Sequence, residues 1–488
     1  MKKVLLWFLM CFLIPLTSQA KQLSYKPNQV IVKFKQSQLL TLQSFDLLLD
    51  DMGATEIHST SLLPELKLIT FKNRHMEDVL ALLSQHPSVE YAEPNFVIHL
   101  FNGDDDGDDD DDNGQFPWPF PFPPPEDGKW PFPWPPGDGG GGKPPFPWPP
   151  GDGGGGGGAT KDPIPVAPPE KIDPQEDPEL SQAWGIQKIS APQAWKKTVG
   201  SKDIIVGIVD TGVDYNHADL SYNIYRNPNE ISDNKIDDDN NGFIDDVVGW
   251  DFVHKDSLPF DDHSHGTHVA GTIGAVGNNG VGVSGVNQYV TILSAKAFDA
   301  QGSGEVATAI EAIEYVVAQG AKVINNSWGD SEFSQALEDV IGAAGEKGVT
   351  VVCAAGNETN NNDKTPMYPA NTNKDNVISV AASTDADKLA FFSNYGKKTV
   401  HLAAPGQGIY STVPGDQYDS MDGTSMASPH VAGAAALLLS AKPELSPKEI
   451  RKLLMDSVDK ISAFANKTAA GGRLNVAKAL EKLQAKLK

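Results

Sequence analysis

The chain has 488 residues, of which 40% are hydrophobic, and its formal net charge is −25. This length suits two domains joined by a linker better than one ordinary domain. The strongly acidic balance excludes nucleic-acid binding, because no basic face could neutralise phosphates, and it leaves carboxylates free to bind metal.

The first 20 residues have the pattern of a secretory signal peptide. Two lysines precede an apolar run over residues 4–15, which is too short to span a bilayer comfortably, and the small residues Ser18 and Ala20 suit a signal peptidase. We expect cleavage after Ala20, the alternative being an uncleaved anchor. No later segment holds about 18 uninterrupted apolar residues, so we expect no membrane span after signal removal. The prediction is a secreted monomer, either extracellular or kept in a periplasm or at a cell surface.

The two cysteines predict no internal disulfide in the mature protein. Cys11 leaves with the signal peptide, so Cys353 is then alone. A secreted protein without disulfides needs other stabilising links, and bound calcium is one candidate.

Residues 21–100 have the pattern of a small separate α+β domain. Short apolar runs predict strands, and apolar residues at helical spacing predict two helices between them. The predicted strands are residues 30–34, 66–71 and 89–92, and the predicted helices are residues 38–51 and 76–85. With one strand fewer, this order approximates β-α-β-β-α-β, that of a ferredoxin-like domain.

Residues 101–174 cannot form a packed core. Residues 104–112 are nearly all aspartate, and a 14-residue repeat rich in proline, glycine and aromatic residues starts at residue 131 and again at residue 145. We interpret this stretch as a disordered linker, in preference to a spacer or an aromatic module that binds carbohydrate or a partner. Its composition also makes it exposed, so a maturation cut could fall there.

From residue 175 to residue 488 the chain alternates apolar strands with helices. In one helix Val306, Ile310 and Ile313 lie on a single face. Such alternation predicts an α/β domain with a mainly parallel sheet and helices on both faces. In these sheets the functional site lies at the carboxyl ends of the strands, where Asp210 and Asn357 are placed.

Three distant motifs together hold the groups needed for catalysis by a serine nucleophile. Asp210 lies in VDTG, His265 in HGTHVAG and Ser425 in GTSMASP. A serine hydroxyl alone is a weak nucleophile. His265 would take its proton and later give it to the leaving amine, and Asp210 would orient the imidazole. Each residue alone could be structural, but their joint occurrence favours catalysis. We interpret other histidines as structural, namely His217, His263, His268 and His430.

The order Asp, His, Ser in these motifs resembles the subtilisin family. The resemblance covers residues 175–485 and implies a subtilisin-like fold and serine endopeptidase activity. Asn357, in the sequence AAGNE, would donate to the oxyanion together with the N-terminus of the helix that carries Ser425. Residues 25–100 resemble the propeptides of this family, which act as folding chaperones and as inhibitors of their own protease.

The resemblance extends to two chain segments that pair with a substrate backbone as added strands, and to one pocket residue. These residues are Gly302, Ser303, Gly304, Ser327, Trp328, Gly329 and Met367. Trp328 and Val306 would shape an apolar subsite. Met367 would form the floor of the primary specificity pocket, where the family commonly has a glycine, and would favour medium-sized apolar side chains. A misalignment of this loop by one residue is the alternative.

An acidic loop indicates a structural calcium site. Asp237, Asp239 and Asn241 alternate before a glycine, as in the first half of an EF-hand loop. The glutamate that closes such a loop is missing, since Val248 stands there, and Asp246 would complete the shell instead. A solvated acidic loop is the alternative.

A second calcium site is implied by the family resemblance alone. Its side-chain ligands would be Asp219, Asn279 and Asp177, with backbone carbonyls beside them. Both ions would be structural, because the proposed chemistry needs no metal.

Together these patterns predict a secreted, calcium-stabilised serine endopeptidase that is made as a self-processing zymogen. It would cleave polypeptides through an acyl-enzyme on Ser425, and its own propeptide would be its intramolecular inhibitor. Two other classes remain open. One is a binding or adhesion protein on an inactive protease fold, and the other is an esterase or peptide ligase that uses the same acyl-enzyme.

Overall fold

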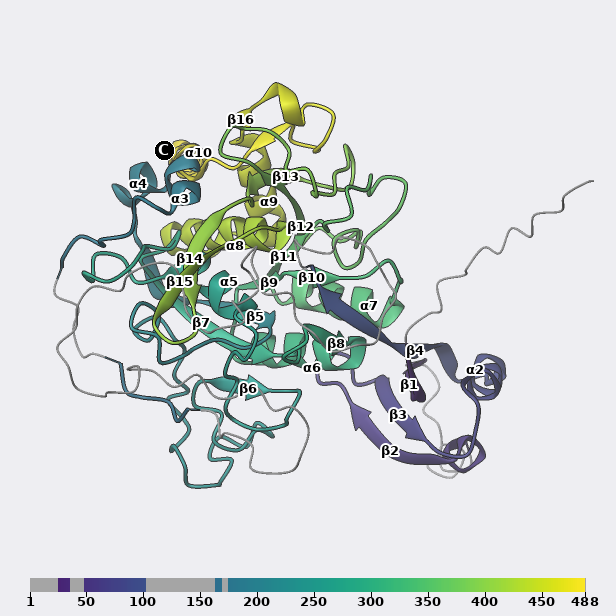
Figure 1. The fold of residues 1–488 in the computed structure, drawn as a ribbon. Coiled ribbons are helices and arrows are strands. Elements are labelled where there is room, and N and C mark those ends of the chain that lie inside the picture. The colour runs from purple at the N-terminus through teal and green to yellow at the C-terminus, as the bar shows by residue number, and fades with distance from the viewer. Residues whose placement is uncertain (1–24, 36–47, 102–162, 169–173, 488) are drawn as a thin grey trace, which may run out of the picture. The chain divides into compact units, whose positions relative to one another are not determined.

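The computed structural model describes residues 25–35, 48–101, 163–168 and 174–487 (Figure 1). The expected signal peptide and most of the expected linker lie outside the described residues. The helix expected at residues 38–51 is described only from residue 48, where the chain is helical.

The N-terminal domain is an antiparallel sheet that faces two different cores. Its elements are β1 (Tyr25–Phe34), β2 (Ala54–Ser59), β3 (Leu66–Phe71), α2 (Met76–Gln85) and β4 (Val89–Leu100). The strands lie in the order β4-β1-β3-β2, and the described elements follow the predicted α+β sequence. Successive side chains of β1 point to opposite faces of the sheet. Val30 and Val32 therefore pack in the core of this domain with α2, whereas Ile31 packs in a core of the C-terminal domain.

Strand β4 extends well beyond the residues 89–92 predicted from the sequence. Its first half pairs with β1, where Ala92 lies opposite Val32. Its second half pairs antiparallel with β8 (Ser303–Glu305) and β10 (Trp328–Gly329) of the C-terminal domain. A strand whose partners lie hundreds of residues away has little local signal, so its second half escaped prediction.

A nine-stranded sheet forms the centre of the C-terminal domain. Its order is β16-β17-β13-β12-β11-β9-β5-β7-β6. All neighbouring strands from β17 to β6 are parallel, as predicted, and only β16 is antiparallel to its neighbour. The strands are β5 (Gly200–Asp210), β6 (Gly249–Asp251), β7 (Tyr289–Lys296), β9 (Val323–Asn326), β11 (Thr350–Ala354), β12 (Val377–Ser383), β13 (Leu402–Pro405), β16 (Asp459–Lys460) and β17 (Gly472–Arg473).

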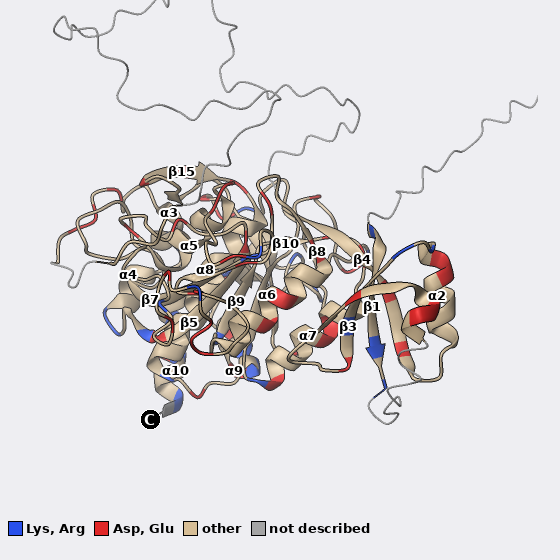
Figure 2. Ribbon diagram, turned by 90° about the horizontal axis from the view of Figure 1, so that it is seen from below, with Lys and Arg blue, Asp and Glu red and all other residues tan. Residues whose placement is uncertain are grey.

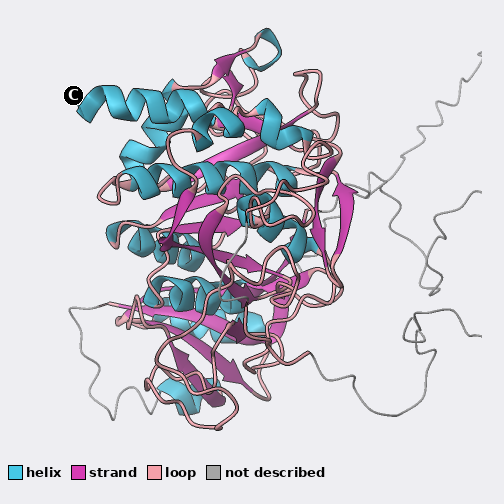
Figure 3. Ribbon diagram, turned by 90° about the vertical axis from the view of Figure 1, so that its left-hand side faces the viewer, coloured by secondary structure: helices cyan, strands magenta, loops and turns pink. Residues whose placement is uncertain are grey.

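Helices cover both faces of this sheet (Figure 1, Figure 3). Ile208 of β5 packs in the core that contains α5 and α8, and its neighbour Val209 packs in the core that contains α6 and α7. The helices are α3 (Trp184–Lys188), α4 (Ala191–Trp195), α5 (His265–Gly274), α6 (Val306–Ala318), α7 (Gln335–Glu346), α8 (Thr424–Ala441), α9 (Pro447–Asp456) and α10 (Val476–Leu487), with a 3-10 turn η1 (Ser462–Phe464) and a hairpin of β14 (Ile409–Val413) and β15 (Gln417–Met421). No helix in the described part of the chain has the length and apolar character needed to cross a membrane.

Candidate active site

The predicted aspartate and histidine form a buried pair. Asp210 is the last residue of β5 and His265 is the first residue of α5, so both lie at the edge where the parallel strands end. His265 Nδ1 donates to Asp210 Oδ1 over 2.7 Å, which leaves Nε2 as an acceptor. Nε2 is buried and has no partner among the described residues, so it is available to take a proton.

The surroundings of His265 adjust its basicity. Burial lowers the pKa of His265, but the charge and hydrogen bond of Asp210, with the charge of Asp261, raise it by more, so the net pKa lies above its usual value. A raised pKa makes the imidazole a stronger base, which suits proton transfer from a hydroxyl group.

Asp261, which sequence analysis missed, joins the aspartate and histidine motifs. Its Oδ1 accepts from Thr211 Oγ1 over 2.8 Å. Its Oδ2 accepts from the Thr267 hydroxyl over 2.6 Å and from the Thr267 backbone N–H over 2.7 Å. These bonds fix the residue after Asp210 against the start of α5. The only hint in the sequence was an aspartate shortly before His265.

Ser425 lies at the N-terminus of α8 and faces the end of β4. Its Oγ lies 2.9 Å from the carbonyl oxygen of Ser327 and 3.2 Å from the carbonyl oxygen of Phe101. The Ser327 hydroxyl donates in return to the Ser425 carbonyl over 2.9 Å. The predicted residue Ser327 therefore fixes Ser425 through two hydrogen bonds.

Asn357, which follows β11, directs its amide at the same carbonyl group. Thr424 fixes its orientation, because the backbone N–H and the hydroxyl of Thr424 both donate to Asn357 Oδ1 over 2.9 Å. The Nδ2 atom then donates to the carbonyl oxygen of Phe101 over 3.0 Å. An amide N–H held in this way can stabilise negative charge that develops on the carbonyl oxygen.

The two predicted substrate-binding segments hold β4 as an added strand. Leu100 lies opposite Trp328, and its N–H donates to the carbonyl of Gly302 over 3.0 Å. Ile98 lies opposite Gly304. Antiparallel pairing on both sides is a general way to bind an extended polypeptide. The predicted residues that meet β4 in this way are Gly302, Ser303, Gly304, Trp328 and Gly329.

Apolar side chains line the same cleft. Ile98 and Leu100 pack in one core cluster with Trp328 and Val306, the two residues expected to shape an apolar subsite. The Trp328 side chain is fully buried and its Nε1 donates to the Val209 carbonyl over 3.0 Å, which fixes the indole. The cleft is therefore formed by side chains that are themselves anchored in the core.

Met367 is the residue expected to form the floor of the primary pocket. It forms a small buried cluster with Phe101 and Ala354. Gly329 borders the same ring, since a Cβ added to Gly329 would lie 2.6 Å from Phe101 Cζ. The pocket holds the Phe101 side chain, which is larger than the medium-sized apolar side chains that a methionine at this position was expected to favour.

Helix N-termini of the C-terminal domain bind the body of the N-terminal domain. Glu93 accepts from the Ser334 hydroxyl over 2.5 Å and from the Gln335 N–H over 2.9 Å at the start of α7. Asn95 Oδ1 accepts from the Ala307 N–H over 2.9 Å at the start of α6. Burial raises the pKa of Glu93, and these hydrogen bonds oppose that rise. Side-chain oxygens at helix N-termini satisfy free N–H groups and meet a favourable dipole.

Charged residues of α6 and α7 make further contacts with the N-terminal domain. Figure 2 shows acidic residues on both helices. Asp339 of α7 pairs with Lys33 over 2.7 Å. Glu314 of α6 accepts from the backbone N–H groups of Ser61 over 2.7 Å and of Leu62 over 2.9 Å.

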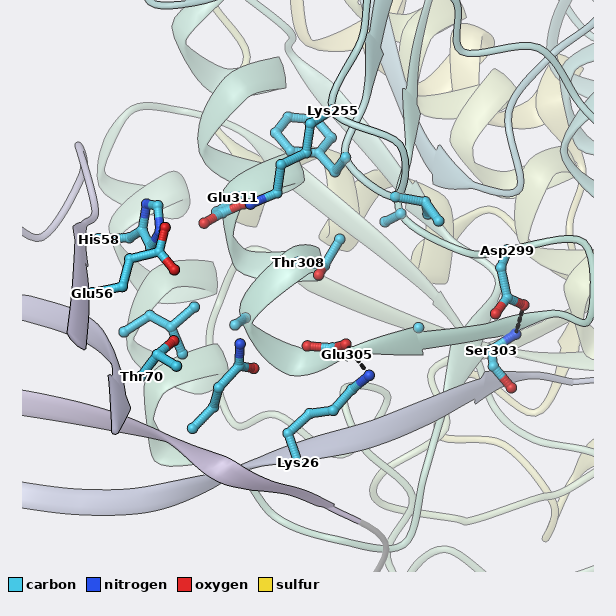
Figure 4. Close-up of a pocket in the computed structure, with 17 residues that line it drawn as sticks. Lys26, Glu56, His58, Thr70, Lys255, Asp299, Ser303, Glu305, Thr308 and Glu311 are labelled. Carbon is cyan, nitrogen blue, oxygen red and sulfur yellow. Dashed lines mark hydrogen bonds and ion pairs between the residues drawn. The ribbon is translucent and has the colours of Figure 1, made fainter. Parts of the chain in front are cut away.

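Beside the cleft, this interface lines a polar cavity of about 370 Å³ at the start of α6, which Ser303 and Gly304 also border (Figure 4). An ion pair between Lys26 and Glu305, 2.6 Å long, lines one part of it, and Glu56, His58 and Glu311 line another. Burial raises the pKa of the Glu311 carboxyl. The interface is therefore less closely packed here than in the cleft.

Two family profiles match the chain. The profile of the Subtilase family matches residues 201–477, more than half of the chain, and the profile of the Fervidolysin N-terminal prodomain matches residues 15–95. The chain belongs to the subtilase family. We accordingly call its two domains the prodomain and the catalytic domain.

Curated relatives of this subtilase include thermitase from Thermoactinomyces vulgaris, with 40% identity over 301 residues, which are 62% of this chain and 96% of thermitase. Subtilisin-like protease 1 of Plasmodium falciparum (isolate 3D7) is 37% identical over 292 residues, which are 56% of this chain and 42% of the relative. The match thus spans less than half the length of that relative. Among solved structures, fervidolysin from Fervidobacterium pennivorans, described as a keratinolytic enzyme, shares the fold with a TM-score of 0.66 and 24% identity, covering 94% of this chain and 61% of fervidolysin.

The acidic loop of the subtilase domain groups carboxylates that suit a hard cation. Oxygens of Glu230, Asp237 and Asp239 all lie within 4.8 Å of one another. Glu230 is not recognisable from the sequence, because it precedes the motif and approaches it only through the fold. Three neighbouring carboxylates repel one another, and calcium prefers such oxygen ligands, so the residues fit the ion.

The other two predicted ligands of this loop lie beside that group. Asn241 Nδ2 donates to Asp239 over 3.2 Å and to Asp246 over 3.0 Å. Asp246 also accepts from Tyr315 of α6 over 2.8 Å, and burial raises the pKa of Asp246 to about 6. In this structure Asp246 therefore anchors the loop to α6.

The second predicted calcium site also brings its residues together. Asp219 Oδ1 accepts from Asn279 Nδ2 over 2.8 Å, and Asp177 Oδ1 accepts from the Asn279 N–H over 3.0 Å. Burial raises the pKa of Asp219 to about 7. Asp177 and Asp219 supply oxygens of the kind that calcium prefers, whereas Asn279 turns its amide nitrogen to Asp219 and its Oδ1 to the Val281 N–H.

The neighbouring histidines have structural surroundings. His268 Nε2 lies 2.7 Å from the Ile409 carbonyl, and burial lowers the pKa of His268 to about 3. His430 Nδ1 lies 2.8 Å from the Met426 carbonyl, and burial lowers its pKa to about 4. Burial also lowers the pKa of His217 and of His263.

Proposed function

We propose that the chain is a secreted serine endopeptidase, made as a self-processing zymogen, that cleaves polypeptides through an acyl-enzyme on Ser425. The observation that carries this proposal is the Phe101 carbonyl. It receives hydrogen bonds from Ser425 and Asn357 while β4 occupies the cleft as an added strand. An inactive binding protein would not need an intact nucleophile and oxyanion donor around one carbonyl.

In the proposed reaction, His265 Nε2 accepts the hydroxyl proton as Ser425 Oγ attacks the carbonyl carbon. The hydroxyl first turns from the Ser327 carbonyl toward the ring. Asp210 stabilises the imidazolium, and Asn357 donates to the oxyanion. His265 then protonates the leaving nitrogen, and water activated by the same ring hydrolyses the acyl-enzyme.

The prodomain would act as the intramolecular inhibitor. Its strand β4 already fills the two segments that a substrate would need. Its contacts with α6 and α7 would keep it bound after cleavage. Secretion is inferred from the signal-peptide pattern of the first 20 residues.

Calcium would be structural at the two acidic sites. Glu230, Asp237 and Asp239 would hold one ion, and Asp177, Asp219 and Asn279 would hold the other. An ion that binds only the folded chain stabilises it by mass action. Chelation should therefore lower the melting temperature. Glu230→Gln should lower the melting temperature in calcium and reduce the further loss on chelation. An unchanged response to chelation in this variant would contradict the first site.

The test of the proposed activity compares the full chain with its Ser425→Ala variant, both made in the presence of calcium. Intact mass spectrometry should show that the first chain splits and the variant stays whole, and a fluorophosphonate should label only the first. If the unaltered chain neither splits nor takes up the label, the proposed function is wrong and an inactive fold is favoured.

A further inference from the structure

The cleft determines which peptide bond lies at the reactive groups. Leu100 is the last residue of β4 and is paired on both sides, with Trp328 opposite it and its N–H bound to Gly302. The next carbonyl along the chain, that of Phe101, is the one that Asn357 and Ser425 contact. The backbone register therefore presents the bond that follows Phe101.

The side chain of Phe101 supports the same register. Only 6% of Phe101 is exposed, and its ring packs on Ala354 and Met367. Gly329 leaves room for the ring, because a Cβ there would come within 2.6 Å of it. Aromatic rings contribute large buried areas, so this contact favours one register over a shift by a residue.

We propose that the prodomain is cut after Phe101, and that the pocket of Gly329, Ala354 and Met367 makes the mature enzyme prefer aromatic residues before the cleaved bond. The inference rests on the proposed function and deepens it. Ser425 Oγ bonds to the Phe101 carbonyl carbon, and the bond from that carbon to the next nitrogen breaks. His265 passes the serine proton to that nitrogen, and water then releases Phe101 as a carboxylate.

This cut has a consequence for the mature protein. Residues from 102 onward stay covalently attached to the catalytic domain after the first cleavage, including the acidic run and the two repeats. The cut therefore falls at the first bond of the stretch 101–174, and almost all of that stretch stays with the mature chain.

The test times the cut in the full chain and in two variants made in calcium. Phe101→Asp places a charge in an apolar pocket and should slow the cut about 100-fold or more. Phe391→Asp is the matched control, because Phe391 is 73% exposed and should leave the rate unchanged. Intact masses at early times should show a downstream fragment that begins at residue 102.

A second measurement remains informative if Phe101→Asp fails to fold. The mature enzyme is given peptide amides that differ only in the residue before the cleaved bond. Phenylalanine should exceed alanine about 100-fold in kcat/KM. A first cut elsewhere, an unchanged rate for Phe101→Asp, or equal cleavage of alanine and phenylalanine peptides would overturn the inference. In those cases fluorophosphonate labelling would persist, whereas failure of the proposed function would abolish labelling too.

Discussion

The prodomain contacts the catalytic domain in two regions that differ in kind. In the cleft, β4 and Phe101 bind through backbone pairing and closely packed apolar side chains, as a substrate would. On α6 and α7, Glu93 and Asn95 bind through helix N-termini, beside a polar cavity of about 370 Å³. Because different residues make the two contacts, the cut and the affinity that remains after it should be separable.

The largest effect should come from removing the nucleophile. Ser425→Ala leaves both regions of contact intact but should slow the cut about 10⁶-fold, the size of the loss known for subtilisin itself. Intact mass spectrometry after long incubation measures it. Ser420→Ala, on the exposed surface of β15, is the control and should process normally. A cut in the Ser425→Ala chain at the normal rate would mean that another protease makes it.

The next largest effect concerns the partner of the base. Asp210→Asn should slow the cut about 10⁴-fold, because the imidazole loses its orientation and its counter-charge. Protonated His265 cannot accept the serine proton, so the rate falls as pH drops through its pKa. Asp210 raises that pKa above the usual value of 6.5, so the acid limb in the unaltered chain should lie above pH 6.5 and should move to lower pH in Asp210→Asn. A pH profile of the cutting rate measures this. An unmoved acid limb would show that another group titrates.

The sequence predicted those parts of the molecule whose signal is local. Asp210, His265 and Ser425 each lie in a short motif at a strand end or a helix start, so their place at one edge of the sheet could be inferred. The parallel sheet followed from the alternation of apolar strands and helices in the same way.

What the sequence could not predict depends on partners that lie far apart along the chain. The second half of β4 pairs only with β8 and β10, more than 200 residues away. The role of Asp261 depends on its hydrogen bond with Thr211, which is 50 residues away in the sequence. The role of Glu230 depends on the fold, which brings its carboxylate close to that of Asp237. These are the contacts that connect the prodomain, the Asp210–His265 pair and the acidic loop to the rest of the molecule.

An intermediate effect should come from the oxyanion donor. Asn357→Ala removes the Nδ2 group that lies 3.0 Å from the Phe101 carbonyl and should slow the cut about 10²- to 10³-fold, a range that comes from subtilisin. The pairing of β4 with the cleft does not involve this side chain, so KM for peptide substrates should change little while kcat falls. Steady-state kinetics on the mature enzyme separate the two. If KM instead rises by as large a factor, Asn357 also contributes to substrate binding before the reaction.

The smallest effect should come from the contacts on α6 and α7, which should change the affinity of the prodomain and leave the cut unaffected. Glu93→Ala removes the carboxylate that binds the Ser334 hydroxyl and the Gln335 N–H at the start of α7. Helix caps of this kind contribute about 0.5–2 kcal/mol, which corresponds to about 2- to 30-fold in affinity. The cut should therefore proceed at the normal rate, while the delay between the cut and the appearance of peptidase activity should shorten by that factor.

Glu77→Ala is the matched control for this variant, because Glu77 is exposed in the first turn of α2 and carries the same group. Mass spectrometry times the cut, and a chromogenic peptide times the activity in the same sample. If Glu93→Ala slows the cut as much as it shortens the delay, the two regions act together, because the contact on α7 would then also set the position of β4 in the cleft.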